Sequence, residues 1–162
     1  MIKWKNIIIH HSASNWGSSL LIDGWHKQKD FNCIGYHFVI LNGFTSAEDY
    51  HKDRRFDFLE GSIEMGRTLD GDEWVEWNET GAHALGFNKN SIGICLIHKD
   101  EPYSFKMINS LLTLLEELII EFQIEPDYIL GHYELDKKKP LCPGLDMQLI
   151  RNLLKIPSIN NI

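Results

Sequence analysis

Two histidines and one cysteine stand where strands of an α/β protein would end. His10 is the first of two histidines at the end of the apolar run 6–11 (NIIIHH), His132 directly follows the run 127–131 (DYILG), and Cys142 lies in the loop beyond it. Sites gather at strand ends in open sheets. Two imidazoles and one thiolate suit Zn²⁺, and three protein ligands leave a fourth position open for water, as in a catalytic site.

Spacing alone leaves a second interpretation of the same three residues open. A histidine after a strand is commonly a packed or surface residue, and a lone buried cysteine commonly serves as a small hydrophobe. On spacing alone, ordinary packing is the more common outcome for such residues, and a zinc site is the competing interpretation.

The elements that would position these side chains alternate in type along the chain. Runs rich in apolar and β-branched residues predict strands at 6–11, 34–41, 61–65, 91–97 and 127–131. Apolar residues at three- and four-residue steps predict helices at 18–29, 105–122 and 145–154, the first capped by Ser18 or Ser19. This alternation predicts an α/β fold: a single domain over 1–162, with a mixed central sheet of about five strands flanked by helices and the zinc site at the strand ends.

Two stretches between these elements are long, acidic and without periodicity. Residues 43–60 are expected to form a loop with room for one helical turn, and residues 69–80 a second loop. Loops of such length in a compact domain are usually functional.

Composition limits the function classes. The formal charge of −7 argues against nucleic acid as the main partner and against simple attraction to anionic membranes or wall polymers. The N-terminal apolar run is too short for a signal peptide, and no stretch reaches the length of a membrane span. Cys33, Cys95 and Cys142 are odd in number and scattered, so we expect reduced thiols and synthesis in the cytoplasm.

Five segments, in order, resemble a known family. They are IIIHHSAS (7–14), WHKQKDFNCIGYHFVI (25–40), EMGR (64–67), GAHALGFNKNSIGICLI (81–97) and GHYEL…CPGLD (131–146). Together they resemble the type-2 N-acetylmuramoyl-L-alanine amidases, which include short phage endolysins and the peptidoglycan recognition proteins. The resemblance implies a zinc hydrolase that cuts the amide between N-acetylmuramic acid and L-alanine in peptidoglycan.

The resemblance also implies roles for individual residues. The zinc ligands of the family fall on His10, His132 and Cys142, with one Zn²⁺ per chain. Its catalytic tyrosine falls on Tyr36, whose phenol would orient the water or hold the developing oxyanion. The histidine of its GAHA-like loop falls on His83, which would line the cleft and bind substrate without touching the metal.

One position departs from the family pattern. Compact phage members carry a catalytic lysine two residues before the ligand cysteine, where this chain has Pro140. We expect Lys139 to substitute, with Lys137 and Lys138 as alternatives, although three successive lysines are also typical of a solvated loop. If none of them acts, Tyr36 and zinc must carry the chemistry.

Alternation along the strands separates the remaining histidines from the site. His11 should point to the opposite sheet face from His10, and His37 away from Tyr36, so both are expected to serve in packing or support.

Three functions remain in competition. The favoured one is a phage or prophage endolysin with peptidoglycan as its partner, active as a monomer and reaching the wall after release from the cell. A non-catalytic peptidoglycan-binding module on the same fold is the alternative. A zinc peptidase that cuts within the stem peptide is disfavoured because the HExxH signature is absent.

Overall fold

A five-stranded sheet forms the centre of the protein. The computed structural model describes residues 4–67, 72, 74–76 and 78–156. Within them the strands are β1 (Asn6–His11), β2 (Phe38–Ile40), β3 (Ile63–Met65), β4 (Ser91–Leu96) and β5 (Ile129–Gly131). Their order is β3-β2-β4-β1-β5; β1 runs parallel to β4 and β5, β2 runs parallel to β4, and β3 is antiparallel at the edge. The predicted mixed α/β sheet is confirmed.

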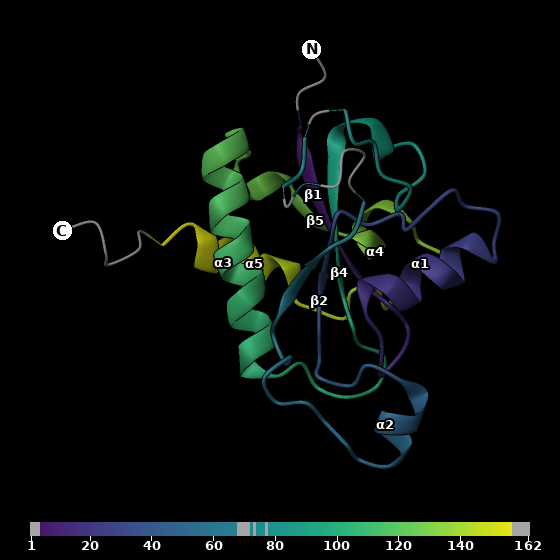
Figure 1. The fold of residues 1–162 in the computed structure, drawn as a ribbon. Helices are drawn as coiled ribbons and strands as arrows, with labels where there is room; N and C mark the ends of the chain where they lie inside the picture. Colours follow the sequence, from purple (N-terminus) through teal and green to yellow (C-terminus); the bar gives the residue numbers. More distant parts are fainter. Residues whose placement is uncertain (1–3, 68–71, 73, 77, 157–162) are drawn as a thin grey trace.

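Helices cover both faces of this sheet. They are α1 (Ser19–Lys27), α2 (Ala47–His51), α3 (Phe105–Phe122), α4 (His132–Leu135) and α5 (Met147–Leu154), with short 3₁₀ turns at Asn88–Asn90 and Pro126–Tyr128. Figure 1 shows α3 and α5 on one side of the sheet and α1 on the other. Side-chain oxygens cap the first turns of α1, α3 and α5, supplied by Ser18, Ser104 and Asp146.

The two faces bury different sets of side chains because residues alternate along each strand. Ile7 and Ile9 of β1 pack into the larger core, beneath the apolar stripes of α3 and α5. A smaller core under α1 contains Ile22, Val39 and Cys95. His10 is paired with Cys95 across β1 and β4, so its side chain shares the face of the smaller core. The candidate metal ligand therefore lies on the α1 face.

Most predicted elements are confirmed, and the differences have local causes. The strand expected at 34–41 is limited to β2, Phe38–Ile40. The backbone oxygens of Gly35 and Tyr36 accept hydrogen bonds from the amides of Ala82 and Arg67, which lie in loops and not in a neighbouring strand. The single turn foreseen in 43–60 is α2. Helix α4 was not predicted, because four residues are too few to show a period. Much of the expected loop 69–80 lies outside the described residues; those that are described contain no helix or strand.

Across the described residues, no helix combines the length and apolar character needed to cross a membrane.

His37 is a buried histidine whose neutral form is built into the sheet. Its Nδ1 accepts from the Gly93 amide at 2.9 Å, and its Nε2 donates to the Glu79 carbonyl at 2.6 Å. Burial lowers the pKa of His37 to about 4. An unfolded histidine titrates near 6.5. Between these values the unfolded chain binds a proton that the folded chain does not.

The free energy of unfolding of the metal-free protein should therefore fall below pH 6.5. The contribution of His37 to this slope is about 1.4 kcal/mol per pH unit, down to about pH 4. His37→Gln keeps one hydrogen-bond acceptor and one donor but cannot titrate. The free energy of unfolding of this variant should therefore depend on pH less steeply, by the contribution of about one bound proton. Urea unfolding of both proteins between pH 7.5 and 5.0 checks this, and equal slopes would contradict it.

Candidate metal centre

The structure brings His10, His132 and Cys142 together. One ligand atom from each lies within 4.8 Å of the others, the single such group of three or more His, Cys, Asp or Glu side chains in the described part of the chain. The Nδ1 atoms of the two histidines are 3.2 Å apart. Two nitrogen ligands of a tetrahedral zinc ion, each at about 2.0–2.1 Å, lie about 3.3–3.4 Å from one another. The spacing of the donors fits this metal.

His10 occupies the most enclosed position of the three. Its strand β1 lies between β4 and β5, and the residue is 1% exposed. Burial lowers its pKa well below the usual value, and the neighbouring His83 and His132 lower it further. A neutral imidazole is the form that binds a metal.

A chain of hydrogen bonds determines which nitrogen of His10 faces the cluster. His83 Nε2 lies 3.3 Å from the Ser91 carbonyl, which can only accept, so this nitrogen carries the proton. Burial lowers the pKa of His83 to about 3, so its ring is neutral and Nδ1 is an acceptor. His10 Nε2 lies 3.0 Å from that Nδ1 and must donate to it. His10 Nδ1 is thereby left with a free lone pair directed at the cluster.

The local sequence holds His83 in this place. The side-chain oxygen of Asn88, five residues on, accepts from the amides of His83 and Ala84 at 2.9 and 2.8 Å. Gly93 lies directly beneath the ring: a Cβ there would approach His83 to 2.5 Å, so any side chain would displace it.

His132 and Cys142 are connected by α4 and the loop that follows it. The amide of Tyr133 donates to the Cys142 carbonyl at 2.8 Å, which fixes the loop against α4. The start of α4 is held by Glu134, whose carboxylate accepts from the Gly131 amide at 2.7 Å and from Arg151 of α5 at 3.1 Å. These contacts join the end of β5, α4 and α5.

The electrostatics of Cys142 are set by competing contacts. Burial raises the pKa of its thiol to about 11, while the His11 amide, 3.4 Å from Sγ, and the nearby charge of Lys139 lower it. A divalent cation would favour the thiolate further. Burial also lowers the pKa of His132, so the donor set at neutral pH is two neutral imidazoles and one ionisable thiol.

Tyr36 lies against the cluster. Its ring is 5.0 Å from that of His10 between centroids and 5.4 Å from that of His26 on α1. Burial raises its pKa well above the usual value, so the phenol stays protonated at neutral pH and is a hydrogen-bond donor. A hydrogen-bond donor beside the three candidate metal ligands is suited to stabilise an oxyanion.

The lysine run is exposed, and its members differ in their relation to the cluster. The positive charge of Lys139 lowers the pKa of both His132 and Cys142, which places its ammonium near them. Neither Lys137 nor Lys138 makes such a contribution.

Four supporting residues were not predicted from the sequence: Asn88, Ser91, Glu134 and Arg151. Asn88, Ser91 and Glu134 lie in segments that match the family motifs, whereas Arg151 lies outside them. His11 points away from His10, as alternation predicts, and contributes its backbone amide to Cys142.

Residues 2–145 match the N-acetylmuramoyl-L-alanine amidase family model. The match covers most of the chain and includes all three residues of the cluster. The chain belongs to this family, and the resemblance inferred from the sequence motifs is confirmed.

Individual relatives agree with this assignment. The chain is 28% identical to the endolysin of Escherichia phage T7 over 152 residues, which cover 88% of this chain and 82% of that protein. Among solved structures it resembles the N-acetylmuramoyl-L-alanine amidase LysC from Clostridium intestinale, with a TM-score of 0.73, 24% identity and coverage of 96% and 87%. Drosophila PGRP-LB has a TM-score of 0.63 at 24% identity, with coverage of 100% and 88%. These two similarities establish the fold.

Proposed function

We propose that the protein is a zinc-dependent hydrolase that cleaves the amide bond between N-acetylmuramic acid and L-alanine in peptidoglycan. The observation that carries the proposal is the cluster of His10, His132 and Cys142 with the ring of Tyr36 beside it. Family membership names the reaction class. The endolysin relatives favour a phage or prophage lytic enzyme that acts on the wall after release. We further propose that residues 1–162 form one catalytic domain and act as a monomer.

Hydrolysis of an unstrained amide needs a nucleophile, stabilisation of the carbonyl oxygen and a proton for the leaving nitrogen. Zinc held by the cluster would supply an activated water and a Lewis acid for the carbonyl. Tyr36 donates its hydroxyl proton in a hydrogen bond to the carbonyl oxygen as negative charge develops there. Lys139 places a positive charge beside the same region and can deliver a proton to the leaving nitrogen. His10 is kept in the correct tautomer by His83.

Mass spectrometry of purified peptidoglycan after digestion tests the reaction. We expect free stem peptides that begin with L-alanine and intact sugar strands. Cleavage inside the stem peptide would indicate a zinc peptidase. Binding without any new product would indicate the non-catalytic module.

His83 should act on the metal through His10. In His83→Ala the buried Nε2–H of His10 loses its acceptor, and loss of such a partner typically weakens metal binding 10- to 100-fold. Competition with a chromophoric chelator measures the zinc affinity. The role in substrate binding suggested by the family resemblance predicts the other pattern, an increase in KM at unchanged zinc affinity. Asn88→Ala, which loosens the His83 loop, should weaken zinc binding in the same direction.

Lys139→Ala should lower kcat about 10- to 100-fold while zinc content stays at one per chain, because the variant removes a charge but no ligand. Lys137→Ala and Lys138→Ala are matched controls from the same exposed run and should retain full activity. Steady-state hydrolysis of a soluble muropeptide measures kcat for all three. Equal kcat values in all three variants would mean that these lysines are only solvated charges in the loop.

A further inference from the structure

The loop between β4 and α3 lies against the two residues that follow Cys142. The Tyr103 hydroxyl donates to the carbonyl of Pro143, a buried residue, at 2.5 Å. The ring of His98 stacks on the ring of Tyr103, with centroids 3.9 Å apart and an angle of 18° between the planes. His98 also lies beside Gly144, where a Cβ would come within 3.7 Å of its Cε1 atom. Both His98 and Tyr103 lie outside the segments that resemble the amidase family.

This loop, residues 97–104, is held in place along its length. At its start the Ile97 amide donates to a carbonyl of β2 at 2.9 Å, and at its end the side chain of Ser104 caps α3. Between them the Asp100 amide donates to the side-chain oxygen of Asn15 at 3.1 Å. The loop is therefore a fixed support for the side chains that it carries.

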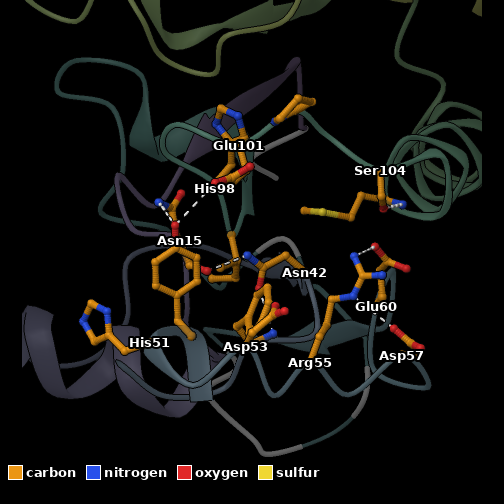
Figure 2. Close-up of a pocket in the computed structure, with 15 residues that line it drawn as sticks. Asn15, Asn42, His51, Asp53, Arg55, Asp57, Glu60, His98, Glu101 and Ser104 are labelled. Atoms are coloured by element: carbon orange, nitrogen blue, oxygen red, sulfur yellow. Dashed lines mark hydrogen bonds and ion pairs between the residues drawn. The ribbon is translucent and has the colours of Figure 1, made fainter. Parts of the chain in front are cut away.

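The two sides of the loop make different contacts. Figure 2 shows His98, Glu101 and Ser104 at the border of a cavity of about 840 Å³, which lies between the loop and the connection from β2 to β3. Tyr103 is not among the residues that line this cavity, and its hydroxyl is bonded to Pro143 instead. Tyr103 thus faces the candidate metal centre from a support that packs elsewhere.

The segment that carries Cys142, residues 136–146, is named here the ligand loop. Its backbone is held locally by the Cys142 amide, which donates to the Lys139 carbonyl at 3.1 Å, and by the Tyr133 amide, which donates to the Cys142 carbonyl. Both contacts join residues that are close in sequence. The bond from Tyr103 comes from 40 residues away and ties the ligand loop to the end of β4.

The Tyr103 hydroxyl is a donor at every pH at which the protein would work. Burial raises the pKa of Tyr103 above its usual value, so the phenol stays protonated. The Pro143 carbonyl can only accept. Without this hydroxyl, a carbonyl in a buried residue loses its donor, which is costly unless the backbone moves. Movement of Pro143 would displace the neighbouring Cys142.

We propose that Tyr103, supported by the stacked ring of His98, is a positioning residue for the metal ligand Cys142. Its hydroxyl holds the ligand loop so that Sγ stays within 4.8 Å of the donor nitrogens of His10 and His132. Partners that orient a metal ligand typically change metal affinity 10- to 100-fold when they are lost. The inference rests on the proposed zinc site, but not on which bond of the substrate is cleaved.

Tyr103→Phe tests the role, because it removes the hydroxyl and keeps the ring that stacks on His98. We expect the zinc affinity of the full chain to fall about 10- to 100-fold, measured by competition with a chromophoric chelator. Tyr50→Phe is the matched control. Its hydroxyl accepts from Asn15 at 3.0 Å and lies 3.4 Å from Glu101, on the cavity side of the loop. This variant also loses a hydrogen bond but should keep the wild-type zinc affinity.

Cobalt(II) in place of zinc reports the position of the sulfur directly. A thiolate bound to Co²⁺ gives a charge-transfer absorption band, and the visible bands depend on the coordination geometry. At saturating Co²⁺, Tyr103→Phe should show a weaker or shifted thiolate band, whereas Tyr50→Phe should reproduce the wild-type spectrum. A loss of stability alone would not change the spectrum of the folded, metal-loaded protein.

Two variants of His98 test the stacked ring and serve if Tyr103→Phe does not fold. His98→Ala removes the ring and should weaken zinc binding about 3- to 10-fold, in line with the worth of an aromatic pair. His98→Phe keeps a ring and should bind zinc like the wild type.

Wild-type zinc affinity and an unchanged cobalt spectrum in both Tyr103→Phe and His98→Ala would overturn the inference. Equal losses in Tyr103→Phe and Tyr50→Phe would also overturn it, since they would reflect general destabilisation. Failure of the proposed function is distinguishable from these results, because it would appear in the wild type as absence of metal binding or as intact peptidoglycan after digestion.

Discussion

Cys142→Ser should lower zinc affinity on the order of 100-fold or more and abolish hydrolysis at micromolar zinc. Zinc sites with four protein ligands bind the ion with a free energy of about 10–16 kcal/mol, so one ligand contributes about 3 kcal/mol. A neutral hydroxyl does not replace a thiolate as a zinc ligand. The variant should remain folded, because both cores lie beside the cluster and are built from other side chains. Elemental analysis after dialysis against a weak chelator measures zinc retention.

Two control variants make this experiment specific. Cys33→Ser changes a half-exposed thiol that contacts Arg67, and Cys95→Ser changes a buried thiol on β4; both should keep one zinc per chain. Cys142→Asp offers a different ionisable ligand and should recover part of the affinity. Equal zinc content in all four variants would remove Cys142 from the site.

Tyr36→Phe should reduce kcat on the order of 100-fold while zinc affinity and fold are unchanged. The substitution removes one hydroxyl and keeps the ring that packs beside His10 and His26. Loss of a single donor to a developing oxyanion costs about 100- to 1,000-fold in rate. Hydrolysis of a soluble muropeptide at saturating zinc provides the rate.

The KM of Tyr36→Phe separates two roles for the residue. If the hydroxyl acts only in the transition state, its loss leaves KM near the wild-type value. If it also binds the substrate in the ground state, its loss raises KM. Because burial raises the pKa of Tyr36, the wild-type rate should not depend on ionisation of this phenol between pH 6 and 9. Unchanged turnover in Tyr36→Phe would leave Tyr36 a packing residue.

The positions of the main elements could be predicted from sequence because local pattern determines them. The apolar stripe of 105–122 has a helical period along its whole length, and α3 has those bounds. The uninterrupted run 6–11 requires cover on both faces, and β1 is a central strand. The limits of β2 could not be predicted, since they depend on hydrogen bonds to distant segments, such as that from Arg67 to Tyr36. Helix α4 is too short to show a period in the sequence.

The amino-acid sequence by itself determined the types of residue available to the site and the order in which the elements carry them. Strand ends, loop positions and family motifs were enough to single out His10, His132 and Cys142. Only the tertiary structure decided how these residues are oriented, because a tautomer depends on what lies opposite each nitrogen. His83 fixes His10 from 73 residues away, and Arg151 of α5 holds Glu134 at the start of α4. A cavity between the connection from β2 to β3 and the loop after β4 is likewise a product of packing, since its lining comes from segments that approach one another only when the sheet has formed.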